Sequence, residues 1–266
     1  MKNSLDYLDH LKQESARFFE ALHDVPSDAP VPTCPSWNAE DLLWHLAEVQ
    51  WFWATVVREH VTEASVANDL KAERPSSRSD VAAFFERASS DLAQILAATP
   101  PETHTWTWSE EQSVRFIRRR QAHEAFIHRI DAEVTAGTQT SMDAILSADG
   151  VDEVLRIMYG GTPSWGRFAP RPEETIRFRA VDTDDSWLVT LGQFTGTDPD
   201  TETSYDEPDI RVADMDSGTD AAATIVGLAA DMNCWLWHRP TAKDVERSGD
   251  AAVLRAFEST ISPGID

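Results

Sequence analysis

Apolar side chains in the first half of the chain recur every three or four residues, which is the spacing of amphipathic helices. The first such segment covers about residues 4–23 and ends at the proline-rich stretch 25–35. The same spacing recurs in three further segments, at about 39–60, 79–98 and 109–135. Because the four segments are of similar length and their links are short or rich in proline, the pattern predicts a bundle of four antiparallel helices.

Polar residues mark where the second of these helices begins. Asn38 is a good N-cap, and Asp41 at the third helical position places a carboxylate close to the arrangement of a capping box. The helix that follows carries His45 on or beside its broad apolar stripe. His45 is therefore predicted to lie at the buried face of this helix.

The second half of the chain changes from helical spacing to short apolar or alternating runs. Two such runs, 175–181 and 186–191, flank the acidic turn sequence 182–185 and predict a β-hairpin. The remaining predicted elements are a helix at about 151–159, a third strand at 210–212, and helices at about 221–237 and 251–259.

These elements predict a fold class of two parts, a helical bundle (α) followed by a small α+β domain. The paired glycines at 160 and 161 are a boundary signal, so we place the bundle at residues 1–160 and the α+β domain at residues 161–266. At 266 residues the chain is long enough for each part to bury a core of its own.

The composition and net charge of the chain indicate which kinds of molecule it can bind. Hydrophobic residues make up 41% of the chain, with 10 Trp and 11 Phe, which favours a folded protein over a disordered one. With 46 acidic and 23 basic side chains the formal charge is −23, which excludes attraction to nucleic acid or to an anionic membrane surface. A small anionic or electrophilic substrate stays compatible with this charge, because a local basic pocket overrides the global field at short range.

Cysteine content and the first residues of the chain bear on its location. Cys34 and Cys234 are the only cysteines, too few for a disulfide framework or a thiolate cluster. The first residues lack the apolar core of a signal peptide, and no apolar run reaches the length of a membrane span. We therefore expect a cytoplasmic protein. We also expect a monomer or a weak homodimer, since a bundle with its own appended domain requires no partner.

Glu124 and His128 lie four residues apart in the fourth predicted helix. Side chains at this spacing project from one helix face about one turn apart, so they can share a small ligand. The neighbouring His123 suggests a zincin motif, but that motif needs two histidines four residues apart, and His123 and His128 are five apart. Because two ligands hold a divalent ion poorly, we predict His45 as the third.

Two imidazoles and one carboxylate suit Zn²⁺, with Ni²⁺, Fe²⁺ and Co²⁺ as other candidates. Three protein ligands leave a position open for water or substrate, which is typical of a catalytic site. Asp131, three residues past His128, is placed to orient that imidazole. Two structural interpretations compete: a surface charge ladder of Arg120, Glu124 and His128, and a hydrogen-bonded core histidine at position 45.

Several short motifs occur together along the chain. In the predicted bundle they are Cys34-Pro35-Ser36-Trp37, Leu42-Leu43-Trp44-His45-Leu46 and the run from Arg119 to Glu133. In the second half they are Ala223-Thr224-Ile225-Val226-Gly227, Trp235-Leu236-Trp237-His238-Arg239 and Ser248-Gly249-Asp250. In these motifs the chain resembles the mycothiol-dependent maleylpyruvate isomerase family, whose bundle belongs to the DinB-like superfamily and whose second domain is sterol-carrier-like.

The resemblance implies a zinc site in the bundle, with mycothiol as a cofactor or co-substrate. The family's His, Glu and His ligands fall on His45, Glu124 and His128, the same residues that spacing selects. The family's essential arginine falls on Arg239, here preceded by His238 in place of the family's glycine. The resemblance thus makes Arg239 a catalytic and cofactor-binding residue.

The basic run 118–120 offers a second group for an anionic ligand, and within it we predict Arg120 as a cofactor-binding residue. For this family a zinc-held thiolate would add to the cis double bond of maleylpyruvate, and elimination after rotation would give the trans isomer. Arg239 or the metal would stabilise the intervening enolate. A thiol S-transferase would instead stop after sulfur attacks an electrophile.

Three other functions are consistent with parts of this pattern. A metal hydrolase would use the same ion to activate water. An Fe²⁺ oxygenase matches the ligand types, although a helical bundle is an unusual context for one. A non-catalytic module would bind a small apolar or thiol compound without turning it over.

Overall fold

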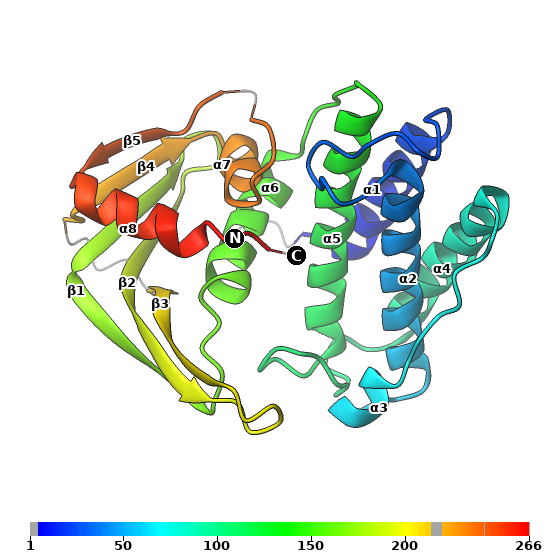
Figure 1. The fold of residues 1–266 in the computed structure, drawn as a ribbon, viewed down its shortest axis with the longest axis horizontal. Helices are drawn as coiled ribbons and strands as arrows, with labels where there is room; N and C mark the ends of the chain where they lie inside the picture. Colours follow the sequence, from blue (N-terminus) through cyan, green and yellow to red (C-terminus); the bar gives the residue numbers. More distant parts are fainter. Residues whose placement is uncertain (1–4, 214–219, 242, 266) are drawn as a thin grey trace. The chain divides into compact units, whose positions relative to one another are not determined.

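A computed structural model describes residues 5–213, 220–241 and 243–265 (Figure 1). The chain divides into two compact units, the first ending at Ser141 and the second beginning at Met142. The first is helical, and the second is a mixed five-stranded sheet with helices, which confirms the predicted fold class. None of the described helices combines the length and the apolar character needed to cross a membrane.

Four long helices and one short one form the first unit. They are α1 (Tyr7–Leu22), α2 (Ala39–Arg58), α3 (Ala64–Asn68), α4 (Arg78–Ala98) and α5 (Val114–Thr135). Helix α1 packs mainly against α5, and α2 packs mainly against α4 (Figure 1). The sequence predicted the four long helices; it did not predict α3, a helix of 5 residues.

The predicted N-terminus of α2 is confirmed. The side chain of Asn38 accepts hydrogen bonds from the backbone N–H groups of Glu40 and Asp41, both at 2.9 Å, and the Asp41 carboxylate accepts from the Asn38 N–H at 3.1 Å. The capping box is therefore complete in the structure. This cap fixes the start of the helix that carries His45.

The predicted start of α5 near residue 109 is wrong, because the helix begins at Val114 with Ser113 as its N-cap. Gln112 folds back on the preceding residues: its amide donates to the carbonyls of Thr107 at 2.6 Å and Ser109 at 2.5 Å. Side chains that bond nearby backbone groups compete with helix formation. The polar segment before Ser113 therefore forms a bend and is not part of the helix.

The apolar core of the bundle is split into two clusters. On α1, α2, α4 and α5 the residues of one cluster lie toward one end of the helix and those of the other toward the opposite end. Between them on three of these helices lie buried polar residues, which we call the polar layer: Glu14, Ser15, Gln50, His128 and Arg129. Gln50 donates to the Ser15 hydroxyl at 2.8 Å, and Arg129 donates to Glu14 at 2.7 Å.

The second unit begins with α6 (Ala144–Glu153), which continues into a turn of π-helix, η1 (Val154–Met158). Its strands and remaining helices are β1 (Gly166–Ala180), β2 (Asp185–Thr197), β3 (Ser204–Val212), β4 (Ala223–Gly227), α7 (Ala229–Leu236), β5 (Glu246–Gly249) and α8 (Ala251–Ile261). The strand order is β3-β2-β1-β4-β5, in which β1 pairs parallel with β4 and every other pair is antiparallel.

The predicted hairpin is confirmed as β1 and β2, although both strands are longer than predicted, and β3 adds the predicted third strand. The predicted helix at 221–237 is wrong over its first half, which forms strand β4. The β-branched residues of β4 pair with β1 on one side and β5 on the other. The strand has only 5 residues, and the alanines around it gave this part of the sequence the spacing of a helix.

The division between the units differs from the boundary predicted after residue 160. Helix α6 groups with the second unit because it packs against α7. The two helices approach closely at Gly150, where a Cβ would lie 2.9 Å from the Asn233 side-chain oxygen. A larger residue at this crossing would have to displace the Asn233 amide. The helix predicted at 151–159 in fact begins at Ala144.

A buried ion-pair network ties α1 to α5. The Arg129 guanidinium, 0% exposed, donates to Glu14 at 2.7 Å and to Glu133 at 3.0 Å. Substitution of Arg129 by Met would leave the two buried carboxylates with only the partly exposed Arg17 as a cation. We predict a loss of about 3–5 kcal/mol in the free energy of unfolding, measured by urea denaturation.

The matched control is Arg58, which pairs with Asp91 at 3.1 Å on the surface. Arg58→Met should change the free energy of unfolding by less than about 1 kcal/mol, because exposed ion pairs contribute little. Equal losses in the two variants would contradict the structural role of the network.

Asp209 on β3 gives the second unit a pH-dependent stability. Burial, with a smaller contribution from Glu207, raises the pKa of Asp209 to about 6, although a hydrogen bond from the Ile210 N–H opposes the shift. Because the folded-state pKa lies above the unfolded one, the ionised carboxylate costs stability above about pH 6, and this cost disappears as the pH falls toward 4.

We predict that Asp209→Asn raises the free energy of unfolding at pH 7.5 by about 1–2 kcal/mol, after allowance for partial solvent screening. The gain should shrink as urea titrations are repeated at lower pH. Asp206→Asn, at an exposed position of the same strand, is the control. A gain for Asp209→Asn that does not depend on pH would rule out this explanation.

Candidate metal site in the helical bundle

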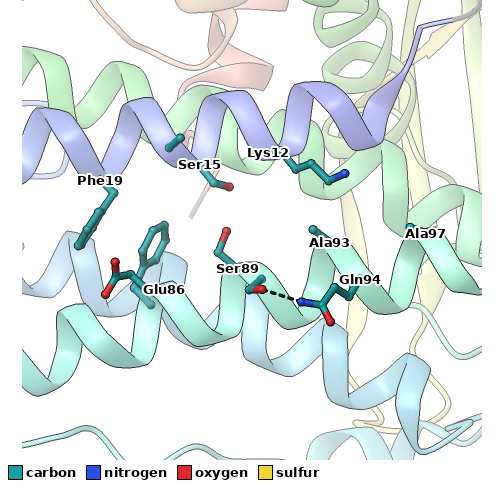
Figure 2. Close-up of a pocket in the computed structure, with 11 residues that line it drawn as sticks. Lys12, Ser15, Phe19, Glu86, Ser89, Ala93, Gln94 and Ala97 are labelled. Atoms are coloured by element: carbon teal, nitrogen blue, oxygen red, sulfur yellow. Dashed lines mark hydrogen bonds between the residues drawn. The ribbon is translucent and has the colours of Figure 1, made fainter.

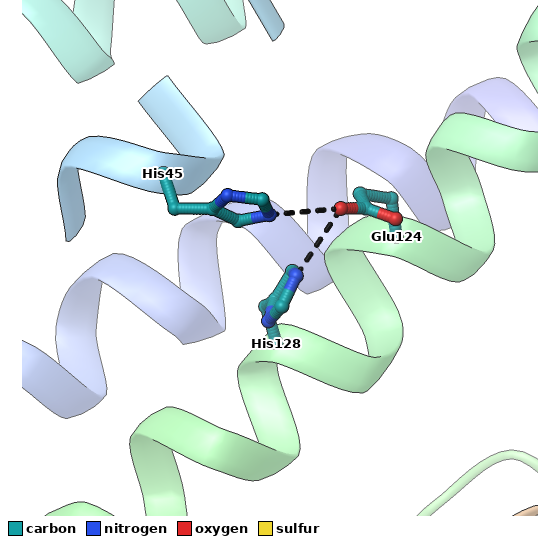
Figure 3. A group of neighbouring side chains, drawn as sticks. All are labelled: His45, Glu124 and His128. Atoms are coloured by element: carbon teal, nitrogen blue, oxygen red, sulfur yellow. Dashed lines mark hydrogen bonds and ion pairs between the residues drawn. The ribbon is translucent and has the colours of Figure 1, made fainter. Parts of the chain in front are cut away.

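His45 on α2 and Glu124 and His128 on α5 point toward one another (Figure 3). The Nε2 atoms of His45 and His128 lie 3.2 Å and 3.1 Å from the same Glu124 oxygen, Oε1. One potential ligand atom from each residue lies within 4.8 Å of the others. The structure thus brings together the three side chains that the sequence selected, and among the described residues no other such group of three is found.

The cluster is closed on the α5 side and open on the α2 side. The His128 side chain is 8% exposed and that of Glu124 is 15% exposed, whereas the His45 side chain is 30% exposed. A surface charge ladder along α5 is therefore a wrong interpretation.

Arg120 divides the two oxygens of the Glu124 carboxylate between different partners. Its guanidinium, with a side chain only 4% exposed, donates to Glu124 Oε2 at 2.8 Å. The other oxygen, Oε1, is left facing the two imidazoles. The contact seen for Arg120 is thus with Glu124, and its cofactor-binding role stays a prediction.

Asp131 contacts the second ring nitrogen of His128. Its Oδ2 lies 2.9 Å from His128 Nδ1, and the carboxylate is fully buried. A carboxylate that accepts the Nδ1 proton fixes the ring orientation and leaves Nε2 as the ligand atom. The Cys34 thiol also donates to Asp131 Oδ2, at 3.9 Å.

These contacts shift two pKa values strongly. Burial by itself would raise the pKa of Glu124, but hydrogen bonds from His128 and His45 and the charges of His128 and Arg120 outweigh it and hold that pKa well below its usual range. Burial would lower the pKa of His128, but its contacts with Asp131 and Glu124 raise it to about 9. Glu124 is therefore an ionised carboxylate, which is the form that binds a metal.

The donor set fits a zinc ion. For ligands about 2.0–2.1 Å from a tetrahedral centre, neighbouring donor atoms lie about 3.3 Å apart. The two distances from Glu124 Oε1 to the imidazole nitrogens, 3.2 Å and 3.1 Å, are close to this value. Two of the three donor–donor distances thus already match a tetrahedral site, and the two imidazole nitrogens lie within 4.8 Å of each other.

Trp37, for which the sequence predicted no role at the site, contacts the cluster. Its ring centroid lies 4.6 Å from that of His45 and 6.1 Å from that of His128. Trp37 directly precedes the N-cap of α2, and this position is the signal in the sequence that it would pack against the start of the helix. By contrast, His123 is buried against Tyr7 and takes no part in the group of three.

A separate pocket of about 520 Å³ opens between α1 and α4 (Figure 2). Small side chains such as Ser15, Ala93 and Ala97 line it and leave the space between the helices unfilled. None of the three clustered residues lines this pocket. The candidate site is therefore defined by the ligand geometry in the bundle, and not by this pocket.

Arg239 lies in the second unit, just after α7, and its Nη1 donates to the Trp237 carbonyl at 2.7 Å. The turn is a Schellman motif: Arg239 N–H bonds the Cys234 carbonyl at 2.7 Å and His238 N–H bonds the Trp235 carbonyl at 3.0 Å. His238 has φ +56°, in the left-handed region that favours glycine. The histidine therefore occupies a backbone position at which glycine is the residue normally found.

Tyr159, at the end of η1, holds the same helix end. Its hydroxyl donates to the Leu236 carbonyl at 2.9 Å. Burial raises the pKa of Tyr159 to about 12, although the charge of nearby Arg239 acts in the opposite direction. The tyrosine is therefore a neutral donor at physiological pH.

An α-helical bundle with an inward-facing His, Glu and His cluster, joined to an α+β unit, defines a class of two-part proteins with a candidate metal site. Two family models match this chain: the mycothiol maleylpyruvate isomerase N-terminal domain over residues 8–133, and the C-terminal domain of the same family over residues 146–256. The chain belongs to the mycothiol-dependent maleylpyruvate isomerase family, which is a family of enzymes.

Solved structures show the same fold. The chain is similar to the crystal structure of a mycothiol-dependent maleylpyruvate isomerase, with a TM-score of 0.55 and 10% identity over 92% of this chain and 93% of that one. It is also similar to a histidine-to-alanine mutant of such an isomerase, with a TM-score of 0.53 and 11% identity over the same shares. No curated protein sequence matches the chain.

The steric cost of the positive φ at His238 can be measured as a change in the free energy of unfolding. Glycine adopts a positive φ without the steric cost that an L side chain incurs, so His238→Gly should raise the free energy of unfolding by about 1 kcal/mol. His238→Ala removes the same ring but keeps a Cβ, and it should give no such gain. Equal stabilisation of the two variants in urea titrations would show that the imidazole, and not the backbone, is the source of the effect.

Proposed function

We propose that the chain is a zinc-dependent enzyme that uses mycothiol to isomerise maleylpyruvate or a similar cis-enoate. The observation that carries this proposal is the convergence of two imidazole nitrogens and one carboxylate oxygen inside the bundle. Membership in the isomerase family supplies the thiol and the substrate class.

His45, Glu124 and His128 would hold the ion, each through one atom. When bound there, zinc keeps a thiol ionised at neutral pH, the form in which sulfur adds to and leaves from carbon. Arg120 balances the charge of Glu124 and leaves one carboxylate oxygen for the ion. Asp131 accepts the Nδ1 proton of His128, so that Nε2 is the nitrogen that would release its proton and bind the ion.

Arg239 is proposed as the residue that binds the anionic part of the substrate or cofactor and stabilises the enolate formed during isomerisation. The Schellman turn holds the backbone of Arg239, and the hydrogen bond from its Nη1 to the Trp237 carbonyl restricts the position of the guanidinium. Arg120 is proposed to orient Glu124. We also propose, independently of that role, that Arg120 binds the cofactor.

The first test is metal content. The purified chain should bind one zinc ion, and His45→Ala and Glu124→Ala should each lower the zinc affinity by at least about 100-fold, since each removes one of three protein ligands. His123→Ala is the matched control, a buried histidine on the same helix that lies outside the group of three. Zinc bound equally well by all four proteins would exclude this site.

The second part of the test is turnover of maleylpyruvate by the zinc-loaded chain with and without mycothiol. Isomerisation that requires both zinc and mycothiol supports the proposal. Consumption of mycothiol as a thioether product would indicate a thiol S-transferase. Hydrolysis of a substrate without thiol would indicate a metal hydrolase, and stable ligand binding without turnover would indicate a binding module.

A further inference from the structure

We propose that Trp37 is a positioning residue that fixes the His45 imidazole for metal binding. This inference rests on the proposed function, because it requires that His45 is a metal ligand. It assigns a role to a side chain outside the group of three donors.

The two imidazoles of the cluster are held in different ways. His128 has a hydrogen-bond partner on each ring nitrogen, Asp131 on Nδ1 and Glu124 on Nε2. His45 contacts Glu124 through Nε2, and no described residue forms a hydrogen bond with its Nδ1. Among the described residues, therefore, no polar group holds the His45 ring at its second nitrogen as Asp131 holds that of His128.

Trp37 is in position to do so. Its ring packs on the His45 ring with centroids 4.6 Å apart and an interplanar angle of 38°. The His128 ring meets His45 edge-on, at 4.7 Å and 73°. The His45 ring thus contacts both an indole and a second imidazole.

The segment that carries Trp37 is itself held firmly. The Trp37 N–H donates to the Cys34 carbonyl at 2.9 Å, and the Trp37 carbonyl accepts from the Val31 N–H at 3.0 Å. The next residue, Asn38, caps α2 through both halves of a capping box. The indole is therefore attached to the start of the helix that carries His45, and it can restrict the ring of that histidine.

The same segment also reaches the other ligand. The Cys34 thiol donates to Asp131, and Asp131 contacts His128 Nδ1. One turn of the chain, residues 34–37, thus contacts His45 directly and His128 both directly and through Asp131. The two histidines differ at Nδ1, where His128 contacts Asp131 and His45 contacts no carboxylate among the described residues.

The test compares zinc affinity in three variants, measured by competition with a chromophoric chelator. Trp37→Ala should weaken zinc binding by about tenfold, within the range seen when residues that orient a metal ligand are removed. Trp37→Phe keeps an aromatic ring against His45 and should stay within about threefold of the unmodified chain. Trp44→Ala is the matched control, because the Trp44 ring lies beside His45 in sequence but packs on Phe84.

A second measurement does not depend on the fold of the alanine variant. Co²⁺ bound at the site should quench the fluorescence of Trp37, and Trp37→Phe should remove most of the quenching. The inference is overturned if Trp37→Ala binds zinc normally, if Trp44→Ala weakens binding as much as Trp37→Ala does, or if Trp37→Phe leaves the quenching unchanged.

The two proposals fail in different ways. A chain that binds no zinc in any form overturns the proposed function and this inference with it. A chain that binds zinc through His45 and Glu124, but with equal affinity in Trp37→Ala, overturns only the role of Trp37.

Discussion

The structure of the site depends on the carboxylate of Glu124, whose two oxygens have different tasks. Arg120 neutralises one of them inside the bundle, and the other faces the imidazoles of His45 and His128. Without the arginine, a carboxylate in this partly buried position would be expensive to keep ionised. With it, Glu124 stays charged in the apo protein, and the two histidines meet at a single oxygen. Every other feature of the site serves to hold one of these three side chains in place.

The bundle accommodates these polar groups by interrupting its core. Two apolar clusters toward opposite ends of the helices supply the burial that stabilises the fold, and the polar layer between them contains internal pairs such as Gln50 with Ser15 and Arg129 with Glu14. A buried ion pair contributes little net stability compared with an apolar pair of the same size, but its geometry is demanding. The Arg129–Glu14 pair in this layer joins α1 to α5, and α5 carries two of the three candidate ligands. Helix α5 thus carries two candidate metal ligands and also the ion pair that joins it to α1.

The helical bundle and the group of three donors could be predicted from the sequence, because both follow from the helical spacing of apolar and ligand residues. Glu124 and His128 share a helix face by spacing alone, and Asn38 marks the start of the helix that carries His45. The start of α5 and the strand β4 were predicted wrongly for a different reason. Gln112 replaces a helical turn with side-chain bonds to nearby carbonyls, and β4 is defined by pairing with strands distant in the sequence. Trp37 was missed because a ring contact across the cap of α2 leaves no periodic pattern.

The central claim is that these three side chains bind one divalent cation at a single point in the bundle. Its most direct test is an anomalous difference map from crystals of the zinc-loaded chain, collected on both sides of the zinc absorption edge. The account predicts one strong peak within bonding distance of the Nε2 atoms of His45 and His128 and of Oε1 of Glu124, with a further position open to solvent. Zinc bound elsewhere, or a cluster that keeps its direct imidazole–carboxylate contacts in the presence of saturating zinc, would contradict it.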